Sequence, residues 1–271
     1  MFDMATIFLF LQLLGVVIGF GIPWSVRRCT RSLSATSYFP PAEEETVVRV
    51  GRFEVHAYEQ ERELSSLDPL RILMQDIASG WGNGKHPTTQ LCLECINDAV
   101  KPGDLVLDYG TGSGILSILS MRLGARRCYA VDIDEDSLRA AERNCQLNGY
   151  RVPEDVDVTH TKYVYIGNDR FEDLADVTVA NILPGPLSRL VAPLWGLSKP
   201  GGLLILSGMR PSELNAIRGI YAPFVDLDTE RVFQQSHEIF GPWVAWTVRW
   251  SVMSAEDSRL ARDRLTEASM N

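Results

Sequence analysis

The chain has 271 residues, of which 45% are hydrophobic and 23% are charged, enough to bury one α/β core. Its formal net charge of -9 argues against a nucleic-acid-binding surface, because such a surface requires clustered basic residues. We therefore expect one catalytic domain that acts on a protein or a small molecule.

The N-terminal segment, residues 1–37, contains an uncharged run over residues 5–24. As a helix this run would extend about 30 Å, the thickness of a bilayer core. The acid-free, Arg- and Ser-rich stretch behind it resembles an organellar transit peptide. Two interpretations remain open. Either residues 1–37 target the protein to a mitochondrion or plastid, or they stay as a membrane anchor that leaves the catalytic domain cytosolic. Membrane contact is expected only through this segment.

Residues 38–67 are predicted to form a linker followed by a small β-addition. Two prolines and three consecutive acids mark the linker, and apolar residues on either side of Gly51 predict two short strands. The main domain is expected over residues 68–250. Residues 251–271 form a polar tail, for which a solvated helix or disorder is expected.

The loop GWGNGKHPTT, residues 80–89, precedes an amphipathic helix that runs to Ala99. Thr88 or Thr89 could cap this helix; alternatively the loop folds over a ligand with Thr89 in contact. The helix also contains a CxxC pair, Cys92 and Cys95. Both cysteines lie on its apolar face without a second pair or a suitably spaced histidine, so we expect reduced thiols and no metal site.

Residues 104–134 read DLVLDYGTGSGILSILSMRLGARRCYAVDID. An apolar strand ends at Asp108, and a turn containing Gly110, Gly112 and Gly114 follows. A helix and a second strand ending at Asp132 come next. This order of strand, glycine turn, helix and strand is typical of the βαβ unit of an open parallel sheet.

The composition of this turn favours a cationic ligand without phosphate. A dinucleotide-binding turn needs glycine or alanine where Ile115 stands, and Asp108 would repel a phosphate. S-adenosylmethionine carries an ammonium and a sulfonium, so Asp108 suits it, and Asp132 can accept hydrogen bonds from both ribose hydroxyls. Glycines let a ligand lie against bare backbone. The alternative is a tight turn that binds nothing.

Further strands are predicted over residues 156–158, 176–182 and 201–207, with a closing pair, 224–233 and 243–250, joined by a Gly241–Pro242 turn. Asn181 lies at the end of the second of these strands. Since the carboxyl ends of parallel strands meet at one edge, we expect Asn181 on the same edge as Gly110 and Asp132. Its alternative role is to cap a helix over residues 185–197.

Four motifs occur in a fixed order, followed by KPGGLLILSG: GNGKHPTTQLCLE, DYGTGSGILSILSMRLGA, VDIDEDSLRAAERNCQLNG and VANILPGPLSRL. Together they resemble the PrmA-type ribosomal protein lysine methyltransferases, including the eukaryotic relatives that methylate the electron-transfer flavoprotein β-subunit. The resemblance implies a Rossmann-like class I methyltransferase fold: an α/β domain with a seven-stranded, mostly parallel sheet, an antiparallel last strand and helices on both faces. It also implies that Thr89, Gly110, Asp132 and Asn181 contact S-adenosylmethionine.

The activity implied by the resemblance is S-adenosylmethionine-dependent methylation of a protein that presents a lysine. Asn181 is expected to orient the acceptor amine. Two departures from the bacterial enzymes bear on the choice of acceptor. Those enzymes carry a separate N-terminal substrate-recognition domain, whereas this chain has only a short segment between the linker and the HPTT loop. Lys85 also stands where they have a threonine. Methylation of a small molecule or a glutamine amide, and a cofactor-binding scaffold without turnover, remain alternatives. Ile182 and Leu183 stand where amide methyltransferases usually have prolines.

Overall fold

The computed structural model describes residues 48–57, 69–75, 84–164 and 174–252. These residues belong to one compact unit, Glu45–Asn271. The predicted N-terminal segment, residues 1–37, lies outside the described residues, as does the tail from residue 253 onward. None of the helices within the described ranges is long and apolar enough to span a membrane.

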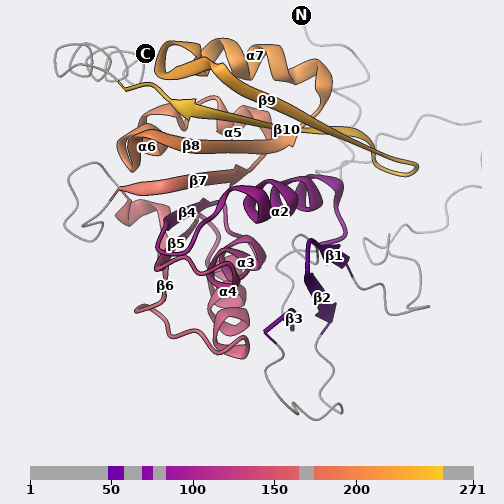
Figure 1. The fold of residues 1–271 in the computed structure, drawn as a ribbon, viewed down its shortest axis with the longest axis vertical. Coiled ribbons are helices and arrows are strands. Elements are labelled where there is room, and N and C mark those ends of the chain that lie inside the picture. The colour runs from indigo at the N-terminus through magenta and orange to yellow at the C-terminus, as the bar shows by residue number, and fades with distance from the viewer. Residues whose placement is uncertain (1–47, 58–68, 76–83, 165–173, 253–271) are drawn as a thin grey trace, which may run out of the picture. The chain divides into compact units, whose positions relative to one another are not determined.

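A seven-stranded sheet forms the centre of the domain (Figure 1), in the order β6-β5-β4-β7-β8-β10-β9. The five strands from β6 to β8 run parallel, and β10 runs antiparallel to both β8 and β9. The last strand of the chain is therefore inserted antiparallel between its neighbours, which confirms the predicted fold class. The strands are β4 (Leu105–Tyr109), β5 (Arg127–Asp132), β6 (Val156–His160), β7 (Ala175–Asn181), β8 (Ser198–Met209), β9 (Val225–His237) and β10 (Gly241–Trp250).

Helices cover both faces of this sheet, as expected (Figure 1). The side chains of β4 alternate between two cores: Val106 packs in the one that includes α2, α3 and α4, whereas Leu105 and Leu107 pack in the one that includes α5, α6 and α7. This alternation follows from the two-residue period of a strand. The helices are α2 (Pro87–Ala99), α3 (Ile115–Arg122), α4 (Glu135–Leu147), α5 (Pro184–Leu187), α6 (Val191–Gly196) and α7 (Pro211–Tyr221), with 3₁₀ turns at Thr161–Tyr163 and Ala222–Phe224.

A small sheet precedes the main one. Its first two strands, β1 (Val48–Val50) and β2 (Phe53–Ala57), pair antiparallel as predicted. A third strand, β3 (Arg71–Met74), pairs parallel to β2 and was missed, because four residues are too few to show a period. The β-addition therefore continues past residue 67. Asn148, the C-cap of α4, donates to the Leu73 carbonyl at 2.8 Å and accepts from the Leu73 N–H at 3.0 Å.

Two predicted elements are wrong in detail. The helix expected over residues 185–197 is broken into α5 and α6, because Pro193 would clash with the carbonyl of residue 189 in a continuous helix. Pro193 instead lies in the first turn of α6. The hairpin turn comprises residues 238–240, and Gly241 and Pro242 belong to β10. Since β8 pairs with β10 only from Val244 onward, the missing N–H of Pro242 leaves no β8 carbonyl unpaired.

Candidate active site

The glycine turn joins β4 to α3 at the carboxyl edge of the sheet. Gly110, Gly112 and Gly114 have positive φ angles of 83°, 54° and 82°, which confirms the predicted tight turn. The N–H groups of Gly110 and Thr111 donate to the Val131 carbonyl at 2.7 and 2.9 Å, so the turn is bound to the end of β5. A Cβ added at Gly112 would meet nothing within 4 Å. The backbone at Gly112 is therefore open to an approaching ligand.

Asp108 lies beneath this turn, with a relative exposure of 0%. Its Oδ2 accepts from the Thr111 hydroxyl at 2.7 Å, the Ser117 hydroxyl at 2.7 Å and the Ser117 N–H at 3.2 Å. Its Oδ1 has no hydrogen-bond partner among the described residues. Burial raises the pKa of Asp108 to about 6, against the lowering effect of the Ser117 and Thr111 hydrogen bonds. The carboxylate thus supports the turn from below, and its contact with a cofactor stays a prediction.

Asp132 ends β5 and accepts backbone hydrogen bonds from two segments. Its Oδ2 accepts from Gly112 N–H at 2.9 Å, and its Oδ1 accepts from Ile133 N–H at 2.7 Å and Asp134 N–H at 3.0 Å. The structure therefore brings together the second glycine of the turn and the acid at the next strand tip. Asp132 is only partly buried, so its carboxylate can still receive hydroxyl donors.

Asn181 and Thr89 meet although 92 residues separate them in sequence. Asn181 ends β7, and its Nδ2 donates to the Thr89 Oγ1 at 3.4 Å. Thr89 lies in the first turn of α2. The resemblance implies that both residues contact the cofactor, and the structure brings their side chains into contact. With Nδ2 directed to Thr89, the Oδ1 of Asn181 is left as an acceptor.

Comparisons with known proteins identify the family of the chain. The family model of the ribosomal protein L11 methyltransferase (PrmA) matches residues 37–241. The chain belongs to the PrmA family. Ribosomal protein L11 methyltransferases of Pseudomonas aeruginosa and Vibrio cholerae are 43% and 40% identical to it, over 159 and 163 residues. These alignments cover 58% and 59% of this chain and 51% and 52% of the relatives, so the chain spans about half the length of the curated relatives it matches.

A crystal structure within the PrmA family resembles the fold. The ribosomal protein L11 methylase of Lactobacillus delbrueckii subsp. bulgaricus superimposes with a TM-score of 0.58 at 28% identity. The match covers 76% of this chain and 98% of that one. It supports the overall fold described above.

Both helix-cap interpretations of the predicted site residues are wrong. The N-cap of α2 is His86, whose Nδ1 accepts from Thr88 N–H at 3.3 Å. The N-cap of α5 is Leu183, without a side-chain capping bond. Neither Thr89 nor Asn181 is therefore the N-cap of these helices, and their contact with the cofactor stays a prediction. Histidine is not among the preferred N-cap residues, so sequence rules alone did not identify it.

The loop after β7 is held against the glycine turn by Ile182. Added Cβ atoms at Gly110 and Gly208 would lie 3.1 Å from Ile182 Cγ1 and 2.3 Å from the Ile182 carbonyl oxygen. Only glycine at position 208 lets the loop lie this close to β8. The Ile182 N–H also donates to the Ser207 carbonyl at 3.2 Å. This packing fixes where Asn181 projects relative to Gly110.

Two exposed apolar side chains border the site, and one of them, Ile133, was not singled out from the sequence. Ile133 follows Asp132 with 73% relative exposure, and Leu183 follows Ile182 with 62%. Single exposed apolar residues are common, so the only available signal for Ile133 was its position directly after Asp132, which ends β5. Both add exposed apolar surface close to polar residues of the candidate site.

The CxxC pair lies within the core. Cys92 and Cys95 are buried on α2, and burial raises the pKa of both thiols, that of Cys95 to about 12. A thiol is reactive as its thiolate, so neither cysteine is suited to redox chemistry at neutral pH. This position agrees with the apolar helix face expected from the sequence.

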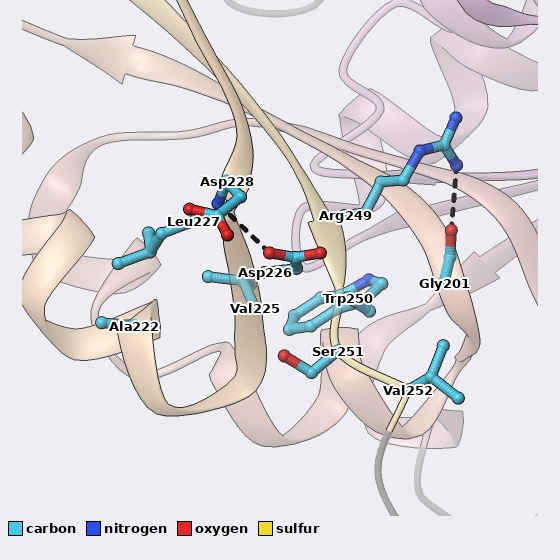
Figure 2. A pocket seen from close by; sticks show the side chains of 10 residues that line it. All are labelled: Gly201, Ala222, Val225, Asp226, Leu227, Asp228, Arg249, Trp250, Ser251 and Val252. Atoms are coloured by element: carbon cyan, nitrogen blue, oxygen red, sulfur yellow. Dashed lines mark hydrogen bonds between the residues drawn. The ribbon is translucent and has the colours of Figure 1, made fainter.

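A pocket of about 650 Å³ lies at the opposite edge of the sheet, where β8 begins and β10 ends (Figure 2). Two of its polar side chains make local hydrogen bonds, whereas the buried indole N–H of Trp250 has no hydrogen-bond partner among the described residues. Asp226 Oδ1 accepts from the Asp228 N–H at 3.1 Å, and Arg249 Nη1 donates to the Gly201 carbonyl at 2.9 Å. None of the predicted site residues lines this pocket, so we place the candidate active site at the carboxyl edge.

Proposed function

We propose that this protein is an S-adenosylmethionine-dependent methyltransferase whose acceptor is a lysine side chain of another protein. The observation that carries the proposal is the contact between Asn181 and Thr89 beside the glycine turn. Membership in the PrmA family supports it, because the matched relatives are named as methyltransferases of a ribosomal protein.

The residues at the carboxyl edge fit this cofactor. Asp132 offers a partly exposed carboxylate for hydroxyl donors, and Gly112 leaves open space beside it. Asp108 adds negative potential under the turn, which favours an ammonium and disfavours a phosphate. Ile133 adds an exposed apolar surface next to Asp132. Carboxylates and bare backbone together suit a cationic nucleoside thioether.

S-adenosylmethionine, when bound, supplies a methyl carbon on a sulfonium sulfur. Transfer requires an acceptor nitrogen in line with the C–S bond. The lysine nitrogen donates its lone pair to the methyl carbon, the C–S electron pair stays on sulfur, and the amine proton leaves to water. No covalent bond to the protein is needed. Positioning therefore supplies the catalysis, worth on the order of 7 to 11 kcal/mol in well-oriented systems.

The acceptor amine must be neutral, although a free lysine has a pKa of about 10.4. Apolar surroundings lower the pKa of an ammonium because they disfavour its charge. Ile182 and Leu183 provide such surroundings directly after Asn181. The Oδ1 of Asn181 can accept a hydrogen bond from the amine and so direct its lone pair. Asn181 is therefore the residue proposed to orient the acceptor amine.

Methylation of a small molecule or a glutamine amide is the second candidate, and a non-catalytic scaffold is the third. Isothermal titration calorimetry with S-adenosylmethionine tests binding, and transfer of a labelled methyl group into organelle lysate, followed by mass spectrometry, identifies the modified side chain. Labelled lysine is the expected product. Label in a small molecule or a glutamine would support the second candidate, and binding without any labelled product would support the scaffold. Heat with a nicotinamide dinucleotide but none with S-adenosylmethionine would contradict all three.

For residues 1–37 the proposal is a targeting segment for a mitochondrion or plastid, supported by the acid-free, Arg-containing stretch behind an apolar run. Fractionation of a tagged protein with carbonate extraction tests it. A soluble organellar fraction is expected, whereas recovery in the carbonate-resistant pellet would indicate a retained anchor.

A further inference from the structure

The hairpin formed by β9 and β10 continues beyond the end of β8. Met209, the last residue of β8, pairs with Val244. The residues from His237 to Trp243, here called the hairpin tip, therefore lie past the carboxyl edge of the sheet. Figure 1 shows this hairpin projecting over the side on which α2 lies.

The hairpin tip contacts the loop that begins α2. The ring of His86 lies 5.0 Å from the ring of Phe240, tilted by 52°, and 5.0 Å from the ring of Trp243, at 68°. Phe240 also lies 4.8 Å from the ring of His237. Such tilted and edge-on arrangements are the favoured geometries of aromatic pairs. The rings that pack against His86 thus belong to residues more than 150 positions later in the sequence.

Arg210 fixes the hairpin tip to the edge of the sheet. It follows β8 directly, and its guanidinium carbon lies 3.7 Å from the centre of the Trp243 ring. Its Nη1 donates to the carbonyls of Phe240 and Pro242. A guanidinium over an aromatic face is favourable by about 0.5 to 2 kcal/mol, more when desolvated. The tip is therefore attached at both the sheet edge and the α2 loop.

His86 connects the hairpin tip to the candidate site. Its Nδ1 accepts from the Thr88 N–H, and its carbonyl accepts from the Thr89 N–H at 3.0 Å. These bonds set the first turn of α2, from which Thr89 reaches Asn181. A chain of contacts through His86 and Thr89 therefore connects the Phe240 ring to the Asn181 amide.

The capping bond requires a neutral imidazole, since both nitrogens of a protonated ring are donors. Burial lowers the pKa of His86, and the positive charge of Arg210 lowers it further. The groups that tether the hairpin tip therefore also keep His86 in the state that can cap α2.

From these contacts we infer that His86 is a positioning residue, through which the hairpin tip sets Thr89 for cofactor binding. The inference rests on the proposed function, because Thr89 is taken as a cofactor contact. It gives the β9–β10 hairpin a role in the reaction. No residue of this hairpin belongs to the site predicted from the sequence. Substitutions that remove the contacts of the hairpin tip should therefore lower the affinity for the cofactor, although they replace no residue that is expected to contact it.

A double-mutant cycle tests this inference with S-adenosylmethionine as the probe in calorimetry on the full chain. Phe240→Leu removes one ring, and His86→Asn removes the other while keeping a side chain that caps helices well. Each should weaken the affinity about three- to tenfold, the range expected for an aromatic pair. The double variant should lose no more than His86→Asn alone, because that substitution already removes the contact of His86 with Phe240 together with that with Trp243.

The matched control is Ile239→Ala in the same hairpin turn. Ile239 is 73% exposed, whereas Phe240 is 37% exposed and its ring packs against His86, so Ile239→Ala should bind like the unmodified protein. Melting temperatures are recorded for all variants. Unchanged affinity with a lowered melting temperature would mean that the rings only stabilise the fold and would overturn the inference, as would losses that multiply in the double variant. No binding by the unmodified protein would instead refute the proposed function.

Discussion

Asn181 at the end of β7 donates a hydrogen bond of 3.4 Å to Thr89 at the start of α2. The bond lies at the carboxyl edge of the sheet and connects two polar side chains, neither of which caps a helix. It places an amide oxygen and a threonine beside the glycine turn, where donor and acceptor would have to meet.

Replacement of Asn181 by alanine should reduce kcat about a hundredfold, comparable to the loss of one orienting hydrogen-bond group in other enzymes. The affinity for S-adenosylmethionine should change much less, because Asp132 and the glycine turn remain. Single-turnover transfer and calorimetry measure the two quantities separately. An equal loss in both would contradict the orienting role.

Asp132→Asn should weaken S-adenosylmethionine binding by roughly ten- to hundredfold, since hydrogen bonds to a charged acceptor contribute about 1.5 to 3 kcal/mol. Calorimetry measures the change. Asp134→Asn is the matched control, because Asp134 caps α4 on the same loop and asparagine caps equally well. Similar losses in the two variants would argue against a specific contact at Asp132.

Asp108 predicts a pH dependence of cofactor binding. Burial raises the pKa of its carboxyl from the ordinary value of 3.8 to about 6. At a pH between these two values the carboxyl is therefore largely protonated in the folded, ligand-free protein. A bound ammonium favours the ionised form, so affinity should rise as the pH increases to about 6 and then level off. By the same linkage, the stability that the protonated carboxyl adds to the ligand-free protein is present below pH 3.8 and is lost as the pH rises through about 6.

Calorimetry near pH 5.5 in buffers with different ionisation enthalpies detects the proton released on binding. Asp108→Asn should abolish the release, since the amide oxygen can still accept from Thr111 and Ser117 but cannot titrate. Release that persists unchanged in this variant would place the titrating group elsewhere.

Gly208→Ala and Gly112→Ala should separate stability from binding. Both positions have positive φ, 90° and 54°, which costs a non-glycine residue about 1 to 2 kcal/mol. Only at Gly208 does the new Cβ also collide, 2.3 Å from the Ile182 oxygen, which adds about 1 to 3 kcal/mol. Urea denaturation should show the larger loss of unfolding free energy for Gly208→Ala. Calorimetry should show the larger loss of affinity for Gly112→Ala, and the reverse ranking would contradict an open ligand face at Gly112.

Much of the fold was accessible from local patterns. The alternation in β4, the glycine turn and the acids at the ends of strands predicted a βαβ unit, and the order of motifs predicted the sheet. The failures have local causes. β3 is too short to show a period, Pro193 was overlooked inside an apolar helical pattern, and Gly241 with Pro242 has the composition of a turn although both residues lie in a strand.

The sequence by itself determined the family, the parallel sheet with its glycine turn, and the residue types of the site, because each depends on spacing within a short segment. Only the tertiary structure decided that Thr89 meets Asn181, that Asp108 lies buried under the turn, and that Phe240 of a distant hairpin holds His86. The physical reason is that these relationships depend on strand order and on helix packing across the sheet. Residues far apart in the chain become neighbours only when the whole core is assembled, so no local period encodes them.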